Sequence, residues 1–210
     1  MTDLTLHDYE LDEHCYKVRL LLGALGCRFT KVTVDVHPGR EQCSARYLAL
    51  NPLGALPILT DDGLVLCGAE AILAYLAHTY DAGHSWLPQE PAMFGQTMQW
   101  LALAGGELQA ASTARLHAIL EVAADAATLE RIARRAFRLM DDHMTKQEFE
   151  NAHWFVGNAA TIADIALFPA IALSRDFGID HDDYPALRRW MARVRTIPGF
   201  TTMPGIPAYH

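Results

Sequence analysis

The sequence predicts two units: a small α/β unit with a mixed four-stranded sheet over residues 1–80, and an all-helical unit over residues 91–210. Short runs of alternating apolar residues, separated by turns, fill the first unit, which is the pattern of half-buried strands. Beyond residue 90 the apolar residues recur at helical spacing, and no strand pattern interrupts them. Between the two lies DAGHSWLPQE, residues 81–90, whose glycine and proline are typical of a linker.

The first unit begins with a strand, a helix and a second strand. Leu4 and Leu6 alternate, apolar residues at 18, 21, 22 and 25 share one helical face, and valines at 32, 34 and 36 alternate again. This order favours a parallel strand pair joined by a right-handed crossover. After a short helix, TDDGL joins Ile58 and Leu59 to Val65 and Leu66 and predicts an antiparallel hairpin. A helix whose apolar face includes residues 72, 73, 76 and 80 follows.

The second unit is expected to consist of helices over residues 93–109, 114–123 and 128–149, with two more towards the end of the chain. In TIADIALFPAIAL, Thr161 stands three residues before Asp164, which predicts a variant capping box at a helix start. The last helix lies in YPALRRWMARVRTIPGF and is expected to end before Pro198. Trp100, Leu103 and Phe137 lie in helical stripes and are expected in the core.

Composition narrows the possible functions. The chain has 210 residues, a net charge of −8 and a pI near 5.6, and no basic run with interleaved aromatic residues, so we expect no nucleic-acid partner. No stretch is long and apolar enough to span a membrane, and the N-terminus lacks a signal pattern, which predicts a cytoplasmic protein. The four cysteines form no CxxC pair, so we expect reduced thiols and no metal site. Cys27, Cys43 and Cys67 are interpreted as small packing residues.

The segment NPLGALPIL, residues 51–59, places Pro57 inside an apparent strand although proline has no N–H for a sheet. If the Leu56–Pro57 bond is cis, the chain turns at the start of the strand and the main chain of Leu56 faces outward. An extended peptide could then bind it. A little later, GAEAILAYL begins a helix whose unpaired N–H groups favour an anion, and Glu70 beside them could hold an ammonium. Together these features suit a small zwitterionic peptide.

With these features the chain resembles the cytosolic glutathione S-transferases. The resemblance is carried by five ordered segments: HDYELDEHCYKVRLLLGALG, NPLGALPIL, GAEAILAYLAHTY, TIADIALFPAI and YPALRRWMARVRTIPGF. It implies a thioredoxin-like domain followed by a helical domain, a homodimer, and glutathione as co-substrate. By this resemblance Leu56 binds the cysteinyl main chain, Pro57 is the cis-proline and Glu70 meets the γ-glutamyl ammonium. A cation at Arg40 could reach the glycyl carboxylate.

The sequence departs from the family pattern at two positions. The family commonly has serine after the acidic residue, where this chain has Ala71, so one hydrogen bond to the γ-glutamyl carboxylate is lost. Bacterial members resembling this chain often have serine where Asp12 stands, and an ionised Asp12 would oppose a glutathione thiolate. Three nearby groups could stabilise the thiolate: His14, Cys15 and the N-terminus of the helix that begins near Cys15.

We favour the helix N-terminus together with Cys15 as the groups that activate the thiol. Cys15 aligns with the site cysteine of beta-class transferases, and the helix dipole is expected to lower its pKa. Cys15 can also be interpreted as an ordinary buried residue of the first turn, and His14 as an ordinary exposed polar residue.

The resulting hypothesis is an enzyme that conjugates glutathione thiolate to small apolar electrophiles. Apolar residues around Met98–Leu108 would supply the wall for that second substrate. Two alternatives stay open. One is a glutathione-dependent thiol/disulfide or peroxide reductase that acts through Cys15, and the other is a non-catalytic binding module that keeps only the fold.

Overall fold

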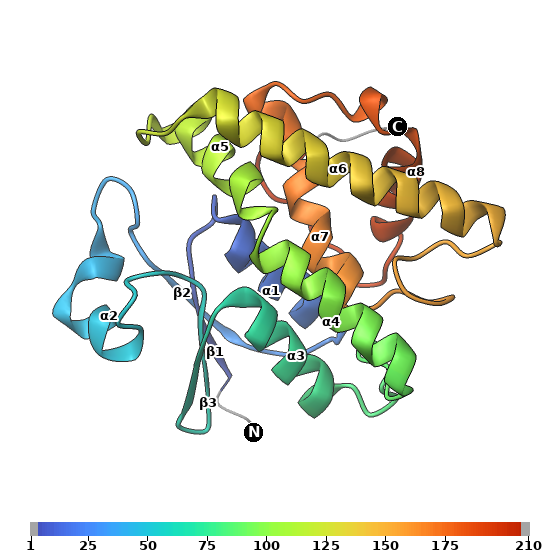
Figure 1. Ribbon diagram of the computed structural model, residues 1–210. Coiled ribbons are helices and arrows are strands. Elements are labelled where there is room, and N and C mark those ends of the chain that lie inside the picture. The colour runs from blue at the N-terminus through green and yellow to red at the C-terminus, as the bar shows by residue number, and fades with distance from the viewer. Residues whose placement is uncertain (1–3, 207–210) are drawn as a thin grey trace.

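The computed structural model describes residues 4–206 (Figure 1). A four-stranded sheet, in the order β2-β1-β3-β4, forms from β1 (Thr5–Asp8), β2 (Thr30–Thr33), β3 (Ile58–Asp61) and β4 (Leu64–Cys67). β1 runs parallel to β2 and antiparallel to β3, and β3 and β4 form an antiparallel hairpin. The expected mixed sheet is therefore confirmed. The hairpin turns at Asp62 and Gly63, which both have positive φ, the conformation that an Asp-Gly turn provides.

Two expected strand limits were wrong. Val34 and Val36 lie beyond the end of β2 at Thr33, and Val34 instead joins Tyr47 and Ile58 in a small second core. β3 begins at Ile58, so Pro57 precedes the strand rather than interrupting it. This position removes the apparent conflict between proline and the sheet, because Pro57 need not donate a ladder hydrogen bond.

Helices α1 (Glu13–Ala24) and α3 (Ala69–Tyr80) pack against each other and against α7 (Ile162–Ala172) of the helical half. The 3₁₀ turn η1 (Glu41–Cys43) and α2 (Ala45–Leu50) lie on the other side of the strands (Figure 1). The face of α1 that carries Val18, Leu21 and Leu22 is fully buried. The starts of α1 and α3 therefore lie where the sheet half meets the helical half.

The helical half consists of α4 (Pro91–Gly105), α5 (Gln109–Leu120), α6 (Ala126–Phe149), α7 (Ile162–Ala172) and α8 (Pro185–Val194), with short 3₁₀ turns η2 (Ser174–Phe177) and η3 (His181–Asp183). The expectation of one helix over 93–109 was wrong. The chain breaks at Gly105 and Gly106, where a Cβ on Gly106 would lie 2.9 Å from the Ala102 carbonyl oxygen. This break turns α5 towards the start of α1. No helix among residues 4–206 has the length and apolarity that crossing a membrane requires.

The capping box at the start of α7 is confirmed. The Thr161 hydroxyl accepts the Ala163 N–H, and the Asp164 carboxylate accepts the Thr161 N–H at 2.9 Å. Asp164 is fully buried and also accepts the Phe155 N–H at 3.1 Å and the Trp190 indole N–H at 2.8 Å. One carboxylate thus joins α7, α8 and the segment before them. Trp100 and Phe137 are buried in the core as expected, and Leu103 packs against it half-buried.

Candidate functional site

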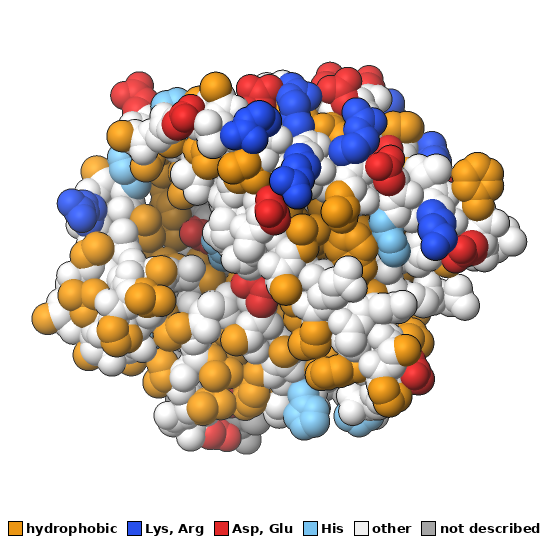
Figure 2. All heavy atoms as spheres, viewed as in Figure 1, with side chains coloured by type: hydrophobic (Ala, Val, Ile, Leu, Met, Phe, Trp, Pro, Cys, Tyr) orange, Lys and Arg blue, Asp and Glu red, His pale blue; other side chains and the backbone are white. Residues whose placement is uncertain are grey.

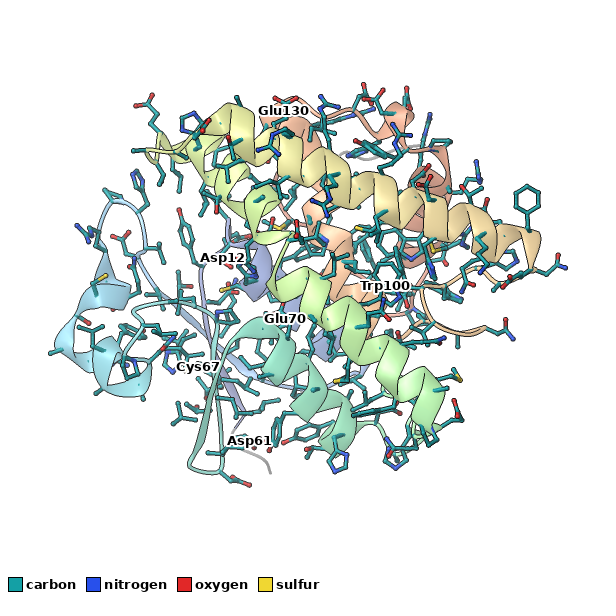
Figure 3. The ribbon with its side chains drawn as sticks, viewed as in Figure 1. Asp12, Asp61, Cys67, Glu70, Trp100 and Glu130 are labelled. Atoms are coloured by element: carbon teal, nitrogen blue, oxygen red, sulfur yellow. The ribbon has the colours of Figure 1, made fainter. Side chains whose placement is uncertain are left out.

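The surface is hollowed between the lobe that carries α2 and the helical half, and acidic side chains lie within the hollow (Figure 2). Asp12, at the start of α1, and Glu70, at the start of α3, both point towards this region, whereas Asp61 lies at the far end of the sheet (Figure 3). The structure therefore brings together the two acidic residues that the sequence predicted for the site, from segments almost 60 residues apart.

Asp12 caps the N-terminus of α1. Its backbone is extended, and its carboxylate accepts the Cys15 N–H at 2.9 Å. One of the first-turn N–H groups that we expected to face the glutathione thiol is thus taken by the protein's own carboxylate. The N-terminus of α1 is therefore not free, which corrects the expectation that its unpaired N–H groups activate the glutathione thiol.

Cys15 is fully buried, and the Tyr9 N–H points at its Sγ from 3.5 Å. Burial raises the pKa of the Cys15 thiol well above its ordinary value, and the negative charges of Asp12 and Asp8 add to this rise. The Tyr9 N–H and Arg19 act in the opposite direction and are outweighed. The expectation that the helix dipole lowers the pKa of Cys15 was wrong, because desolvation and two nearby carboxylates exceed the effect of the helix end.

We predict that Cys15 resists alkylation in the folded protein. At pH 7 iodoacetamide should label Cys43, which is exposed and not the packing residue that we expected, and leave Cys15 unmodified until the protein is unfolded. Peptide mass spectrometry after timed labelling measures both rates on one sample, with Cys43 as the internal control. Labelling of Cys15 as fast as Cys43, with protection by glutathione, would show an accessible thiolate and contradict this prediction.

The loop before β3 is held by Asn51, which the sequence reading did not single out. Asn51 is buried, its amide donates to the Ala55 carbonyl at 2.8 Å, and its side-chain oxygen accepts the Leu53 N–H at 3.1 Å. The Leu56–Pro57 peptide bond is cis. Among the described residues, no hydrogen-bond partner is found for the main chain of the half-buried Leu56. A polar main-chain edge thus remains available beside the sheet.

The start of α3 differs from the start of α1 because its N-cap residue, Gly68, supplies no side-chain oxygen to the first-turn N–H groups. Glu70 and the exposed Ala71 lie in this first turn. They line a cavity of about 480 Å³ with Met98, Leu101, Ala102 and the glycine pair that ends α4. The expected apolar wall from Met98 onwards therefore lies beside Glu70.

Glu70 also has a partner that the sequence did not reveal. The Lys17 ammonium, with 1% of its side chain exposed, donates to Glu70 Oε1 at 2.9 Å. Burial alone would raise the pKa of Glu70, but the Lys17 charge and hydrogen bond hold it below its ordinary value, and the glutamate's own N–H and His14 contribute in the same direction. Lys17 also approaches His14 Nδ1 at 3.3 Å. Glu70 is therefore ionised and already partly neutralised.

Helix α5 fixes the loop that leads into α1. The Arg115 guanidinium is buried, donates to the Leu11 carbonyl at 2.5 Å and pairs with Asp176 at 2.7 Å. Ser112, on the same helix, donates to the buried carboxylate of Glu13. The helical half thus holds the first turn of α1 in place, through contacts between residues about 100 positions apart that no local pattern indicates.

Arg40 is exposed in the loop after β2, with a left-handed backbone, and no ion pair of it is found within residues 4–206. A larger cavity, of about 770 Å³, lies between α4, α5 and α6. Trp100, Ala102 and Leu103 of the expected apolar wall line it, but none of the residues predicted to bind or activate glutathione does. We place the site in the hollow by the starts of α1 and α3, because charged groups and an unpaired main-chain edge occur there.

A mixed four-stranded sheet with helices on both faces, followed by an all-helical half, is a thioredoxin-like domain joined to a helical domain, with a polar site where the two meet. Comparisons with known proteins agree. Residues 6–85 match the family described as Glutathione S-transferase, N-terminal domain, and residues 106–198 match its C-terminal domain.

Glutathione S-transferase GstB of Escherichia coli K12 is 30% identical over 201 residues, which cover 91% of this chain and 92% of the relative. A probable maleylacetoacetate isomerase of Vibrio cholerae is 27% identical and covers 95% and 94%. The crystal structure of a glutathione S-transferase from Pseudomonas fluorescens superposes with a TM-score of 0.85 at 27% identity, over 96% of this chain and 98% of that one. The chain therefore belongs to the glutathione S-transferase family.

Proposed function

We propose that this protein binds glutathione and transfers its thiolate to small apolar electrophiles. The observation that carries the proposal is the pairing of an unbonded Leu56 main chain with the uncapped start of α3 beside an ionised Glu70. The first can bind the cysteinyl main chain, the N–H groups can bind the γ-glutamyl carboxylate, and Glu70 can bind the ammonium. A family homologue from Lodderomyces elongisporus, 25% identical with a TM-score of 0.84, was solved with two glutathione molecules per subunit.

The cavity beside Glu70 suits the second substrate, the apolar electrophile. Met98, Leu101 and Ala102 give it an apolar wall, and the lack of side chains at Gly105 and Gly106 leaves room next to the proposed thiol position. Arg40 is exposed and its charge is available for the glycyl carboxylate.

Calorimetric titration with glutathione, followed by an assay of conjugation to chlorodinitrobenzene, tests the proposal. We expect binding below the millimolar range and thioether formation. Absence of heat at millimolar glutathione would favour the alternative of a non-catalytic module that has kept only the fold. Reductase chemistry through Cys15 is disfavoured by the burial of that thiol and its raised pKa.

We predict that Ala71→Ser tightens glutathione binding by about tenfold, because a serine hydroxyl in the first turn of α3 would donate to the γ-glutamyl carboxylate and a hydrogen bond to a charged group contributes about 1.5 kcal/mol or more. Ala127→Ser is the matched control, since Ala127 is also exposed in a helix first turn but lies on α6. Calorimetry on both variants measures the change. Equal affinities for Ala71→Ser and the unmodified protein would place the carboxylate elsewhere.

We further propose a homodimer in the cytoplasm, with residues 81–90 as the linker between the two domains. Exposed apolar side chains on the helical half, such as Phe94 and Leu139, are compatible with a covered face. Light scattering at several protein concentrations tests the assembly. A mass of 23.3 kDa at every concentration would exclude the dimer.

A further inference from the structure

Lys17 is an unusual residue for the interior of this fold. It lies on α1 among fully buried apolar residues, and only 1% of its side chain is exposed. Its ammonium contacts two groups: Glu70 Oε1 on α3 at 2.9 Å, and His14 Nδ1 one turn earlier on α1 at 3.3 Å. A buried ammonium needs a paired, hydrogen-bonded partner, and the Glu70 carboxylate provides one for Lys17.

The contact with His14 determines which ring nitrogen carries a proton. A lysine ammonium has three donors and no lone pair, so His14 Nδ1 must be the acceptor. The proton of the neutral ring is then on Nε2. No hydrogen-bond partner of Nε2 is found among residues 4–206, and Nε2 is not one of the buried unpaired atoms of that part of the chain. It is a donor that a ligand can reach.

The other two groups that the sequence offered for thiol activation are already engaged. Asp12 occupies the Cys15 N–H at the start of α1, and the Cys15 thiol is buried. His14 lies on the first turn of the same helix, half-buried, and shares the Lys17 ammonium with Glu70, the residue proposed to hold the γ-glutamyl end of glutathione. The cysteinyl sulfur follows that end after a single peptide bond.

We infer that Lys17 is a positioning residue, which holds His14 as the Nε2–H tautomer, and that this N–H donates to the glutathione thiolate. The inference rests on the proposed function for the identity of the ligand. No covalent step is assigned to either residue. The other charged groups near the His14 ring are Asp12 and Glu13 at the start of α1, Glu70 on α3 and Arg115 on α5. Asp12, Glu13 and Arg115 line a small cavity of about 90 Å³ together with His14.

The tautomer is measured without glutathione. Nitrogen-15 spectra of the histidine rings, assigned with His14→Gln, should show His14 protonated at Nε2 and not at Nδ1 at neutral pH. In Lys17→Met this preference should be lost, whereas the signal of His78, at the exposed end of α3, should not change. A His14 ring protonated at Nδ1 in the unmodified protein would overturn the inference, whatever the protein binds.

The effect on the thiol is measured by the ultraviolet absorbance of bound thiolate against pH. His14→Ala should reduce the acid dissociation constant of the bound thiol about tenfold or more. His14→Gln, whose amide also donates a hydrogen bond, should reduce this constant less than His14→Ala does. His78→Ala should leave it unchanged. Lys17→Met should reduce the acid dissociation constant of the bound thiol in the otherwise unmodified protein but not in the His14→Ala variant, because Lys17 acts through the His14 ring.

Additive effects of the two substitutions on the thiol, or no effect of His14→Ala on a bound thiol, would overturn the inference. A protein that shows the expected tautomer and binds no glutathione would refute the proposed function and leave the role of Lys17 in fixing the ring intact. Circular dichroism of Lys17→Met establishes that it is folded, and the double variant Lys17→Met/Glu70→Gln provides a background without an unpaired carboxylate.

Discussion

Replacing Asp164 with alanine is expected to lower the free energy of unfolding by about 3–5 kcal/mol. The carboxylate is fully buried and accepts N–H groups from Thr161, Phe155 and Trp190 at 2.8–3.1 Å. The methyl group of alanine would leave all three donors buried without a partner, and each costs about 1–3 kcal/mol. The loss also removes the cap of α7, a helix whose residues are all buried.

Urea unfolding, followed by tryptophan fluorescence and circular dichroism, measures the change. Asp125→Ala is the matched control, since Asp125 also caps a helix, α6, through the Thr128 N–H, but at the surface. It should be far less destabilising. Should Asp164→Ala fail to fold, Asp164→Asn keeps the shape and one acceptor oxygen, and is expected to be stable enough to measure. Equal stability of Asp164→Ala and Asp125→Ala would show that the three donors find other partners.

Replacing Glu70 with alanine is expected to have two separable effects. The first is on stability: the Lys17 ammonium would remain buried without its carboxylate, which costs about 3–5 kcal/mol when one partner of a buried pair is removed. Lys17→Met/Glu70→Ala should recover much of this loss, because a buried ion pair replaced by apolar groups is often neutral in stability. Unfolding of the two single variants and the double variant completes the cycle.

The second effect is on glutathione. Glu70→Gln keeps an amide oxygen that accepts from Lys17, so it should fold, but it lacks the charge that the γ-glutamyl ammonium needs. We expect glutathione affinity to fall about tenfold to a hundredfold, measured by calorimetry. Unchanged affinity would mean that Glu70 serves the ion pair with Lys17 alone.

The pH dependence of stability gives an independent check on Glu70. Its pKa in the folded protein is lower than the ordinary value of 4.5, so the folded state binds fewer protons there than the unfolded chain. The stabilisation by the ion pair should therefore be complete above about pH 5 and disappear as the pH falls through the folded pKa. Glu70→Gln should lack this component, and the difference between the two pH curves isolates it.

Much of the fold could be predicted from local patterns. The alternation of Leu4 and Leu6, the Asp-Gly turn and the spacing of Thr161 and Asp164 each reflect interactions within a few residues, and all three proved to be correct. The helix expected over 93–109 failed at Gly105 and Gly106, because the apolar period continues across the break while the backbone at Gly106 approaches the Ala102 carbonyl too closely for a side chain.

Site residues were harder to predict, because charge and burial depend on neighbours distant in sequence. Cys15 was correctly placed in the first turn of a helix, yet the direction of its pKa shift depends on desolvation and on Asp8 and Asp12, which the fold brings around it. Nothing in the sequence pattern singles out Lys17. Only the packing of α1 against α3 places it beside Glu70, 53 residues away, with the Lys17 side chain buried and that of Glu70 still partly exposed.

The sequence by itself determined the order of strands and helices along the chain and the family, because these follow from short-range periodicity and from motifs. Tertiary structure alone decided which polar groups are buried, which are paired, and which remain available to a ligand. The physical reason is that the free energy of a charge depends on its distance from solvent and from other charges, and both distances are set by the packing of segments that lie far apart in the chain.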